Sequence, residues 1–436
     1  MCFKFELMKK TILPLMLFLF SLFVQTNAQT MPAGADPKLW AQALKIHRRA
    51  IIVDGHNDIP SPMFDDDFDL ATSSVGKFHR DGDPFHTDLR RFKQSGITGE
   101  FFSIYVDRKY AENGGSGAAR RALDLIDVTY RAVEKYPNEL VQCTTAAQIR
   151  QAKRANKICA LMGIEGGHAI EDSLFALREF YRLGVRYMTL THNNTNNWAD
   201  AHRDTPRNNG LSDFGKEVVR EMNRLGMLVD IAHVSEKTMS DVLDVSTAPI
   251  IASHSGARGV ADHTRNVPDA ILRRMPKNGG VIMVNFYPAF LDAKYNADEN
   301  DRTKRLKPQI DQLKEQYKNN PEAYNEAERK LLAANPIDVP SYTKIVDHID
   351  YIKNLIGIDY VGIGSDFDGV PLLPKGMNGM EDLPRVTYEM LRRGYSEQDI
   401  RKVLGENFLR AFARAEAAAK INTRRISGDG SLKRIK

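Results

Sequence analysis

The sequence predicts an α/β protein whose parallel strands close into a (β/α)8 TIM barrel. Short, β-rich apolar runs alternate with helical patterns along most of the 436 residues. Several of these runs are continuously apolar, as expected for strands that are covered on both faces. A doubly wound open sheet is the main alternative. No Gly-x-Gly-x-x-Gly motif follows the first expected strand, which counts mildly against a dinucleotide-binding sheet.

Eight strands are expected, and most of them end in polar residues. The expected strands are Ile51–Asp54, Phe101–Val106, Ile158–Ile164, Arg186–Leu190, Met227–Ile231, Ile250–Ala252, Val281–Phe286 and Tyr360–Gly364. Helical patterns lie between them, for example at Ala118–Tyr136, Ser173–Leu183, Asp213–Leu225 and Ser235–Val245. Ser235, followed by Glu236 and Lys237, has the character of a helix N-cap.

A charged stretch from Asp292 to about Asn335 interrupts this alternation after the seventh expected strand. Its composition predicts an exposed helical insertion in a strand-to-helix loop. Such loops surround the C-terminal face of a barrel, so the insertion is expected near the mouth. A solvated elaboration, a lid that shapes the substrate site and a subunit contact are the alternatives for its role.

The N-terminus has the pattern of a secretory signal peptide, expected to cover residues 1–28. Lys9 and Lys10 precede an apolar stretch from Ile12 to Val24, and Ala28 offers a small residue for cleavage. The stretch is shorter than the roughly 20 residues that span a bilayer, although a retained signal anchor is the alternative. We therefore expect an exported protein, periplasmic or secreted, without a stable membrane span. Translation starts at Met1 or at Met8.

The charge and cysteine content exclude several classes of protein. The formal net charge is +5, and this excess lies in the C-terminal tail, expected to cover residues 419–436. Because no basic stripe runs through the expected barrel domain, residues 29–418, we expect no nucleic-acid partner. Three cysteines in this length exclude a scaffold built on disulfides. Cys143 and Cys159 are expected either to pair after export or to remain buried thiols.

The expected strand ends carry an unusual set of histidines and carboxylates. His56 and Asp58 follow the first strand, and the side-chain period of two places them on the same side. Glu165 ends the third strand, before two glycines that permit close approach of the backbone. His233 and His254 follow the fifth and sixth strands. In a barrel, all five side chains would meet at the C-terminal mouth.

This set of side chains predicts a metal centre. A single histidine at a strand end is more often part of the core, but buried charged groups are costly unless they are paired or bound to metal. Three imidazoles and two carboxylates suit a pair of divalent ions with one bridging carboxylate. Mixed nitrogen and oxygen ligands favour Zn²⁺ over Mg²⁺ or Ca²⁺, although Mn²⁺ or Co²⁺ could substitute.

The remaining histidines are not expected to bind metal. Those placed in helices or loops away from the strand ends are His47, His79, His86, His202 and His348. His168 and His263 are expected near the mouth, in supporting or surface positions. The cysteines lack the spacing of a zinc–thiolate site.

Eight strings, in order from about residue 50 to 415, resemble the renal or membrane dipeptidase family. They are VDGHNDI at Val53–Ile59, GIEGGH at Gly163–His168, YMTLTHN at Tyr187–Asn193, LVDIAHVS at Leu228–Ser235, IASHS at Ile251–Ser255, RNVP at Arg265–Pro268, VNFY at Val284–Tyr287 and GSDFDG at Gly364–Gly369. Each string alone is weak, but together they are highly specific. The resemblance implies a (β/α)8 barrel of the amidohydrolase type that carries two zinc ions.

The resemblance also implies a role for each residue of the site. His56 and Asp58 would bind one zinc ion, His233 and His254 the other, and Glu165 would bridge both. His192 would contact the scissile carbonyl, and Arg265 would hold the C-terminal carboxylate of the substrate. Asp366 would serve at the substrate amine and in proton transfer. Homodimers occur in the family, so a homodimer is an open possibility here.

The expected activity is hydrolysis of dipeptides that have a free C-terminal carboxylate, through a hydroxide that bridges the two zinc ions. A related hydrolase acting as a deaminase or on phosphoesters is one alternative, and a non-catalytic binding protein on the same barrel is another. The sequence departs from the mammalian members in three ways. It lacks the cysteine that follows His192 in those enzymes, it has a longer charged insertion, and it shows no C-terminal lipid-anchor signal.

Overall fold

The computed structural model describes residues 29–111 and 117–427, so the expected signal peptide lies outside the described residues. Its centre is a sheet of nine strands in which every pairing is parallel. Eight strands follow the order β2-β1-β9-β8-β7-β6-β5-β4, and β2 pairs with β4 to close the ring. This closure confirms the predicted TIM barrel and excludes the open sheet.

The barrel strands lie close to the predicted ones. They are β1 Val53–Asn57, β2 Gly99–Tyr105, β4 Ile158–Glu165, β5 Val185–Thr189, β6 Leu228–Asp230, β7 Ile251–Ser255, β8 Val281–Val284 and β9 Val361–Ile363. The first strand begins two residues later than predicted and extends through His56, and β7 extends through His254. Both histidines therefore belong to the barrel wall and not to the loops after it.

The ninth strand, β3 (Leu140–Gln142), was not predicted. It pairs with the beginning of β4, on the edge that β5 occupies further along. A disulfide joins Cys143, directly after β3, to Cys159 in β4. This disulfide decides between the two expectations for these cysteines and fixes β3 to the barrel wall.

Helices surround the barrel. They are α1 Pro37–Arg49, α2 Pro60–Asp65, α3 Leu89–Ser95, α4 Ala118–Lys135, α5 Ala146–Ala155, α6 Leu174–Arg182, α7 Asp213–Leu225, α8 Glu236–Val245, α9 Asp269–Leu272, α10 Met275–Asn278, α11 Pro288–Leu291, α14 Thr343–Ile356, α15 Pro384–Arg392 and α16 Glu397–Arg401. Local sequence sets their ends. Ser235 caps α8 as predicted, because its side chain accepts a hydrogen bond from the amide of Thr238 at 3.2 Å.

Apolar side chains fill the N-terminal end of the barrel. Phe101 of β2 lies 4.8 Å from the ring of Tyr187 and 5.4 Å from the ring of Phe408, at the start of α17 (Asn407–Ser427). All three side chains are buried. This end is therefore closed, and the chemistry is confined to the opposite end. Helix α17 continues past residue 418, so the predicted boundary of the basic tail falls inside a helix.

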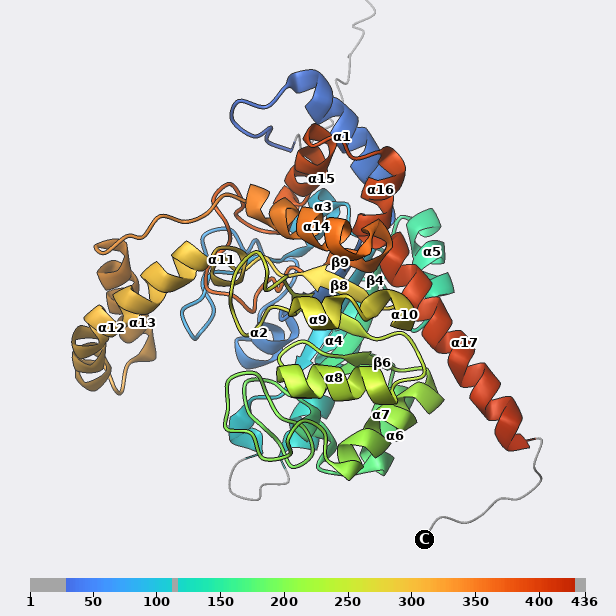
Figure 1. Ribbon diagram of the computed structural model, residues 1–436. Helices are drawn as coiled ribbons and strands as arrows, with labels where there is room; N and C mark the ends of the chain where they lie inside the picture. The colour runs from blue at the N-terminus through green and yellow to red at the C-terminus, as the bar shows by residue number, and fades with distance from the viewer. Residues whose placement is uncertain (1–28, 112–116, 428–436) are drawn as a thin grey trace, which may run out of the picture.

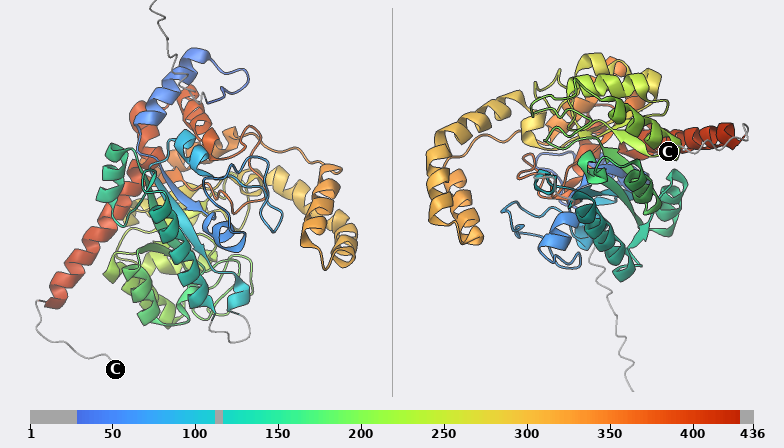
Figure 2. Two further views of the ribbon diagram at one scale, coloured as in Figure 1. Left: turned by 180° about the vertical axis from the view of Figure 1, so that it is seen from behind. Right: turned by 90° about the horizontal axis from the view of Figure 1, so that it is seen from below.

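The predicted insertion consists of two helices, α12 (Ala293–Gln316) and α13 (Pro321–Ala333), which follow the seventh barrel strand, β8. They form an arm that projects from the body of the molecule (Figures 1 and 2). The base of the arm lines the cavity at the barrel mouth, through residues that include Glu299, Arg302 and Leu332. The expected position near the mouth is confirmed.

Candidate metal centre and active site

The polar residues of the strand ends meet at the C-terminal mouth of the barrel. His56 and His254 lie within β1 and β7, Glu165 ends β4, and His233 and Asp366 follow β6 and β9. His233 and Asp366 have left-handed backbone angles, with φ of 63° and 66°. Such conformations are rare for residues other than glycine and cluster at functional sites.

Glu165 lies between two groups of side chains. Its Oε1 is 2.9 Å from Nε2 of His233 and 3.3 Å from Nε2 of His254. Its Oε2 is 3.4 Å from Nε2 of His56, and that nitrogen is 3.2 Å from Oδ2 of Asp58. Each oxygen of one carboxylate thus faces a different pair of ligand-type residues.

A hydrogen bond at Nδ1 holds the ring of His56 in place, on the side away from Glu165. Its Nδ1 lies 2.7 Å from the hydroxyl of Tyr187, and this hydroxyl donates to the carbonyl oxygen of Gly55 at 3.1 Å. Because the tyrosine proton is already used, Nδ1 of His56 must carry the hydrogen of this contact. In the neutral ring the lone pair therefore lies on Nε2, which faces Asp58 and Glu165.

The other two histidines follow the same rule with different partners. Nδ1 of His254 lies 2.7 Å from Oγ of Ser253, which donates to the buried carboxylate of Asp230 at 2.6 Å. Nδ1 of His233 lies 3.1 Å from Oδ1 of Asn193. In all three histidines Nδ1 is bound and Nε2 is turned toward Glu165. This is how metal-binding histidines are usually held.

The electrostatics of the cluster fit positively charged ions. Burial raises the pKa of Glu165 to about 7 and also raises the pKa of Asp366, because carboxylates crowd the site. Burial holds the pKa of His233 and of His254 well below the usual range, so both rings are neutral. Their Nε2 atoms lie 2.9 Å apart with lone pairs facing each other. A cation bound between these donors would offset both the crowding of the carboxylates and the repulsion between the two lone pairs. The mixed set of nitrogen and oxygen donors suits a transition metal.

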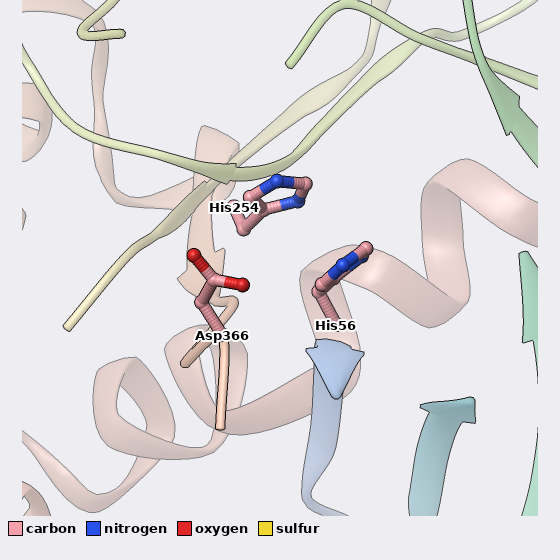
Figure 3. A group of neighbouring side chains, drawn as sticks. All are labelled: His56, His254 and Asp366. Atoms are coloured by element: carbon pink, nitrogen blue, oxygen red, sulfur yellow. The ribbon is translucent and has the colours of Figure 1, made fainter. Parts of the chain in front are cut away.

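Asp366 completes the cluster beside His56 and His254, and ligand-type atoms of these three residues lie within 4.8 Å of one another (Figure 3). Its Oδ2 accepts a hydrogen bond from Nδ2 of Asn285 at 2.8 Å. Gly369 lies so close that a Cβ there would collide with the carboxylates of Asp58 and Asp366. The glycine at this position allows the two carboxylates to approach the same space.

His192 and Arg265, predicted to contact substrate, line the same cavity. A ligand atom of His192 lies within 4.8 Å of those of Glu165 and His233. Burial, helped by Arg265, lowers the pKa of His192 to about 3, so its ring is neutral.

Arg265 is 2% exposed and donates to the carbonyl oxygen of His254 at 3.1 Å. Its guanidinium lies over the ring of Phe290, 5.2 Å from the ring centre. Its Nε has no partner among the described residues. Burial lowers the pKa of Arg265 to about 10, which leaves the group charged at neutral pH. A buried, charged guanidinium with a free N–H is suited to an anion.

The cavity has a volume of about 1290 Å³ and brings in histidines that were expected elsewhere. His79 and His202 both line it, so the expectation that they lie away from the site is wrong. Nε2 of His79 lies 3.2 Å from Oδ1 of Asp368, and His202 contacts Asn193. Both histidines belong to long loops at the mouth. The path of such loops in space cannot be predicted from any local periodicity of the sequence. His263 lines the cavity as expected.

Sequence reasoning also missed the residues that hold the metal-type histidines: Tyr187, Asn193, Ser253 and Asp230. The sequence did contain a signal for two of these residues, Ser253 and Asp230. Ser253 directly precedes His254, and Asp230 precedes His233 by three residues, so both lie in the strings that carry the predicted ligands. Tyr187 lies on β5, across the barrel from His56, and its side chain points into the barrel, which the period of two along this strand permits.

The sequence matches the membrane dipeptidase family, peptidase family M19, over residues 40–425. The chain belongs to this family. The dipeptidase also resembles solved structures of comparable proteins. The probable dipeptidase PvdM of Pseudomonas aeruginosa is 25% identical, with a TM-score of 0.72, and the match covers 88% of this chain and 100% of that one.

Two further structures agree in fold. The dipeptidase AC, a metallopeptidase of family M19, is 25% identical, with a TM-score of 0.67 over 84% of this chain and 98% of that one. A metallopeptidase of Rhodobacter sphaeroides, solved with a phosphinate mimic of the dipeptide L-Ala-D-Ala, is 24% identical, with a TM-score of 0.66 over 84% and 99%. Family membership makes this chain a metal-dependent dipeptidase. Within residues 29–111 and 117–427, no helix of the dipeptidase has the length and apolar character needed to cross a membrane.

Proposed function

We propose that this dipeptidase binds two zinc ions and hydrolyses dipeptides that have a free C-terminal carboxylate. The observation that carries the proposal is the position of Glu165, whose two oxygens face two separate pairs of donors. His56 and Asp58 would hold one ion and His233 and His254 the other, with Glu165 shared. When bound, such a pair of ions lowers the pKa of water and polarises the scissile carbonyl.

Arg265 is proposed to bind the terminal carboxylate of the substrate. A planar guanidinium matches a carboxylate in two parallel hydrogen bonds, and burial strengthens the attraction. The positive charge of Arg265 and its place in the lining of the cavity support this role. A substrate with a blocked or extended C-terminus would lose this contact, which limits the enzyme to dipeptides.

His192 and Asp366 are proposed to act at the reacting bond. The neutral ring of His192 can donate one N–H to the negative charge that develops on the carbonyl oxygen. Asp366 can accept a proton from the attacking water and return it to the departing amine. Its bond from Asn285 leaves one carboxylate oxygen, Oδ1, for that proton.

The insertion is proposed to shape the substrate site. Oε2 of Glu299, on α12, accepts a hydrogen bond from the hydroxyl of Tyr287 at 2.8 Å, and Oε1 accepts one from Tyr295 at 3.1 Å. Tyr287 packs edge-on against Phe290, which covers the guanidinium of Arg265. These contacts link the base of the arm to the residue proposed to bind the substrate carboxylate.

Export is proposed from two observations. Lys9, Lys10 and the following apolar stretch have the order of a secretory signal, with cleavage near Ala28. The disulfide between Cys143 and Cys159 is stable in an oxidising compartment and rare in the cytosol. Both observations support a periplasmic or secreted enzyme.

Zinc content and a substrate panel test the proposal together. We expect two zinc equivalents per chain and chelator-sensitive hydrolysis of simple dipeptides. C-amidated dipeptides, tripeptides, nucleobases and phosphotriesters are expected to remain intact. Hydrolysis of a nucleobase or a phosphotriester in preference to dipeptides would overturn the proposed substrate class. Full activity of the chelated, zinc-free protein would overturn the proposed cofactor.

A further inference from the structure

The side-chain amide of Asn193 lies among three histidines of the barrel mouth. Its Oδ1 is 3.1 Å from Nδ1 of His233 and 2.9 Å from Nε2 of His202. Its Nδ2 is 3.2 Å from Nε2 of His192. One short side chain therefore contacts a proposed metal ligand, a proposed substrate-binding residue and a histidine of the cavity wall.

The direction of each hydrogen bond follows from the amide. Oδ1 can only accept, so His233 donates from Nδ1 and His202 donates from Nε2. Nδ2 can only donate, so Nε2 of His192 accepts and its ring hydrogen lies on Nδ1. The reverse orientation of the amide would require the hydrogen of His233 on Nε2. That nitrogen lies 2.9 Å from Oε1 of Glu165, so a hydrogen on it would occupy the position that a shared metal ion needs.

Neighbouring contacts hold Asn193 in this position. Nδ1 of His202 lies 2.8 Å from the hydroxyl of Thr264, which can donate to it. The backbone amide of His202 donates to the carbonyl oxygen of His233 at 2.8 Å. The loop that carries Asn193 is therefore joined to the His233 segment by the backbone as well as by the side chains.

The support of His233 differs from that of the other two histidines. Tyr187 and Ser253, which hold His56 and His254, are fully buried. Asn193 is exposed and lines the cavity that the substrate must enter. A residue in this position can act on a metal ligand and on a substrate contact at the same time.

We propose that Asn193 is the positioning residue that orients His233 for metal binding and, through the other end of the same amide, fixes the tautomer of His192. The inference rests on the proposed function and adds to it a residue that connects one metal position to substrate binding. The two ends have separable effects: Oδ1 acts on the metal, and Nδ2 acts on the substrate contact.

Two substitutions at this position separate the two ends. Asn193→Leu removes both, whereas Asn193→Asp keeps an acceptor for His233 and His202 but presents no donor to His192. Asn197→Leu is the matched control, because Asn197 lies on the same loop, is exposed and bonds only to Asp172 among the described residues, at 2.7 Å. Zinc affinity is measured by competition with a chromophoric chelator, and kcat and KM are measured on a dipeptide at saturating zinc.

For Asn193→Leu we expect the affinity for one of the two zinc ions to fall about tenfold to a hundredfold, the usual effect of losing a partner behind a ligand. Asn193→Asp is expected to keep both affinities within about threefold of the wild type while kcat/KM falls. Asn197→Leu is expected to match the wild type in both measurements. Thermal unfolding of each variant identifies any loss of fold, and Asn193→Asp still tests the contact with His192 through kcat/KM if the leucine variant is unstable.

Wild-type zinc affinity in Asn193→Leu, or equal loss of zinc in the aspartate and leucine variants, would overturn the inference alone. Unchanged kcat/KM in Asn193→Asp would overturn its second half. Wild-type protein that binds fewer than two zinc ions or leaves dipeptides intact would overturn the proposed function, and the inference with it.

Discussion

Nδ1 of His56 lies 2.7 Å from the hydroxyl of Tyr187, and this contact decides which nitrogen of His56 is free for a metal. The tyrosine comes from β5, on a different side of the barrel, and its ring is buried beneath the site. The orientation of this proposed ligand is therefore set by the packing of the barrel interior. The loops at the mouth are therefore not the only part of the protein that holds the His56 ring in place.

Replacing Tyr187 by phenylalanine removes this support with little change in volume. We expect zinc affinity at the His56 position to fall about tenfold to a hundredfold, since the ring is no longer held in one tautomer. Competition with a chromophoric chelator measures the change. Tyr130→Phe is a matched control, because the Tyr130 hydroxyl bonds to the carbonyl oxygen of Leu183, outside the described site. Equal zinc affinities in the two variants would contradict the role of Tyr187.

Arg265→Lys keeps a positive charge but loses the planar fork. We expect KM for dipeptides to rise about tenfold to a hundredfold, or about 1.4 to 2.8 kcal/mol, with unchanged zinc content. Steady-state kinetics on a dipeptide and on its C-terminal amide check this expectation. The wild type should discriminate strongly between the two substrates and the variant weakly. If the variant discriminates as well as the wild type, Arg265 does not bind the carboxylate.

Asp366→Asn removes the proposed proton acceptor and keeps the size of the side chain. We expect kcat to fall about 10²- to 10⁴-fold, the usual contribution of a general acid–base group. KM and the zinc content, measured on the same preparation, should change little. A wild-type kcat would leave Asp366 without a role in proton transfer.

The strand ends could be predicted because parallel strands of a barrel all finish at the same face. The side-chain period of two predicts that His56 and Asp58 lie together, and their side chains are 3.2 Å apart. His79 and His202 could not be placed, since they lie in loops whose path depends on tertiary packing. The three-residue strand β3 was too short to give a periodic signal. The arm of α12 and α13 was recognised by its charge, but its contact with Tyr287 depends on a hydrogen bond that has no sequence pattern.

Acid should destabilise the metal-free protein through His348. Its Nδ1 accepts the amide hydrogen of Ala257 at 2.9 Å and its Nε2 donates to the carbonyl oxygen of Leu291 at 3.2 Å, so the ring must be neutral. Burial lowers its pKa from 6.5 to about 4. Between these values the unfolded chain binds a proton that the folded chain does not, so stability falls as the pH falls through this window.

Urea unfolding of the chelated protein measures this effect. From pH 7.5 to pH 5, His348 should account for a loss of about 2 kcal/mol in the free energy of unfolding. His348→Asn keeps an acceptor near Ala257 but cannot titrate. The free energy of unfolding of this variant should therefore fall by about 2 kcal/mol less than that of the wild type over the same pH range. Identical pH dependence in the two proteins would show that His348 is not the group responsible.

The shared carboxylate of Glu165 is central to the proposed metal site, and the zinc stoichiometry of Glu165→Ala tests it most directly. Elemental analysis of the purified variant, beside wild type loaded in the same way, should show that both zinc ions are lost from the variant and that dipeptide hydrolysis disappears with them. A Glu165→Ala protein that retains two zinc equivalents and full activity would contradict a site built on this carboxylate.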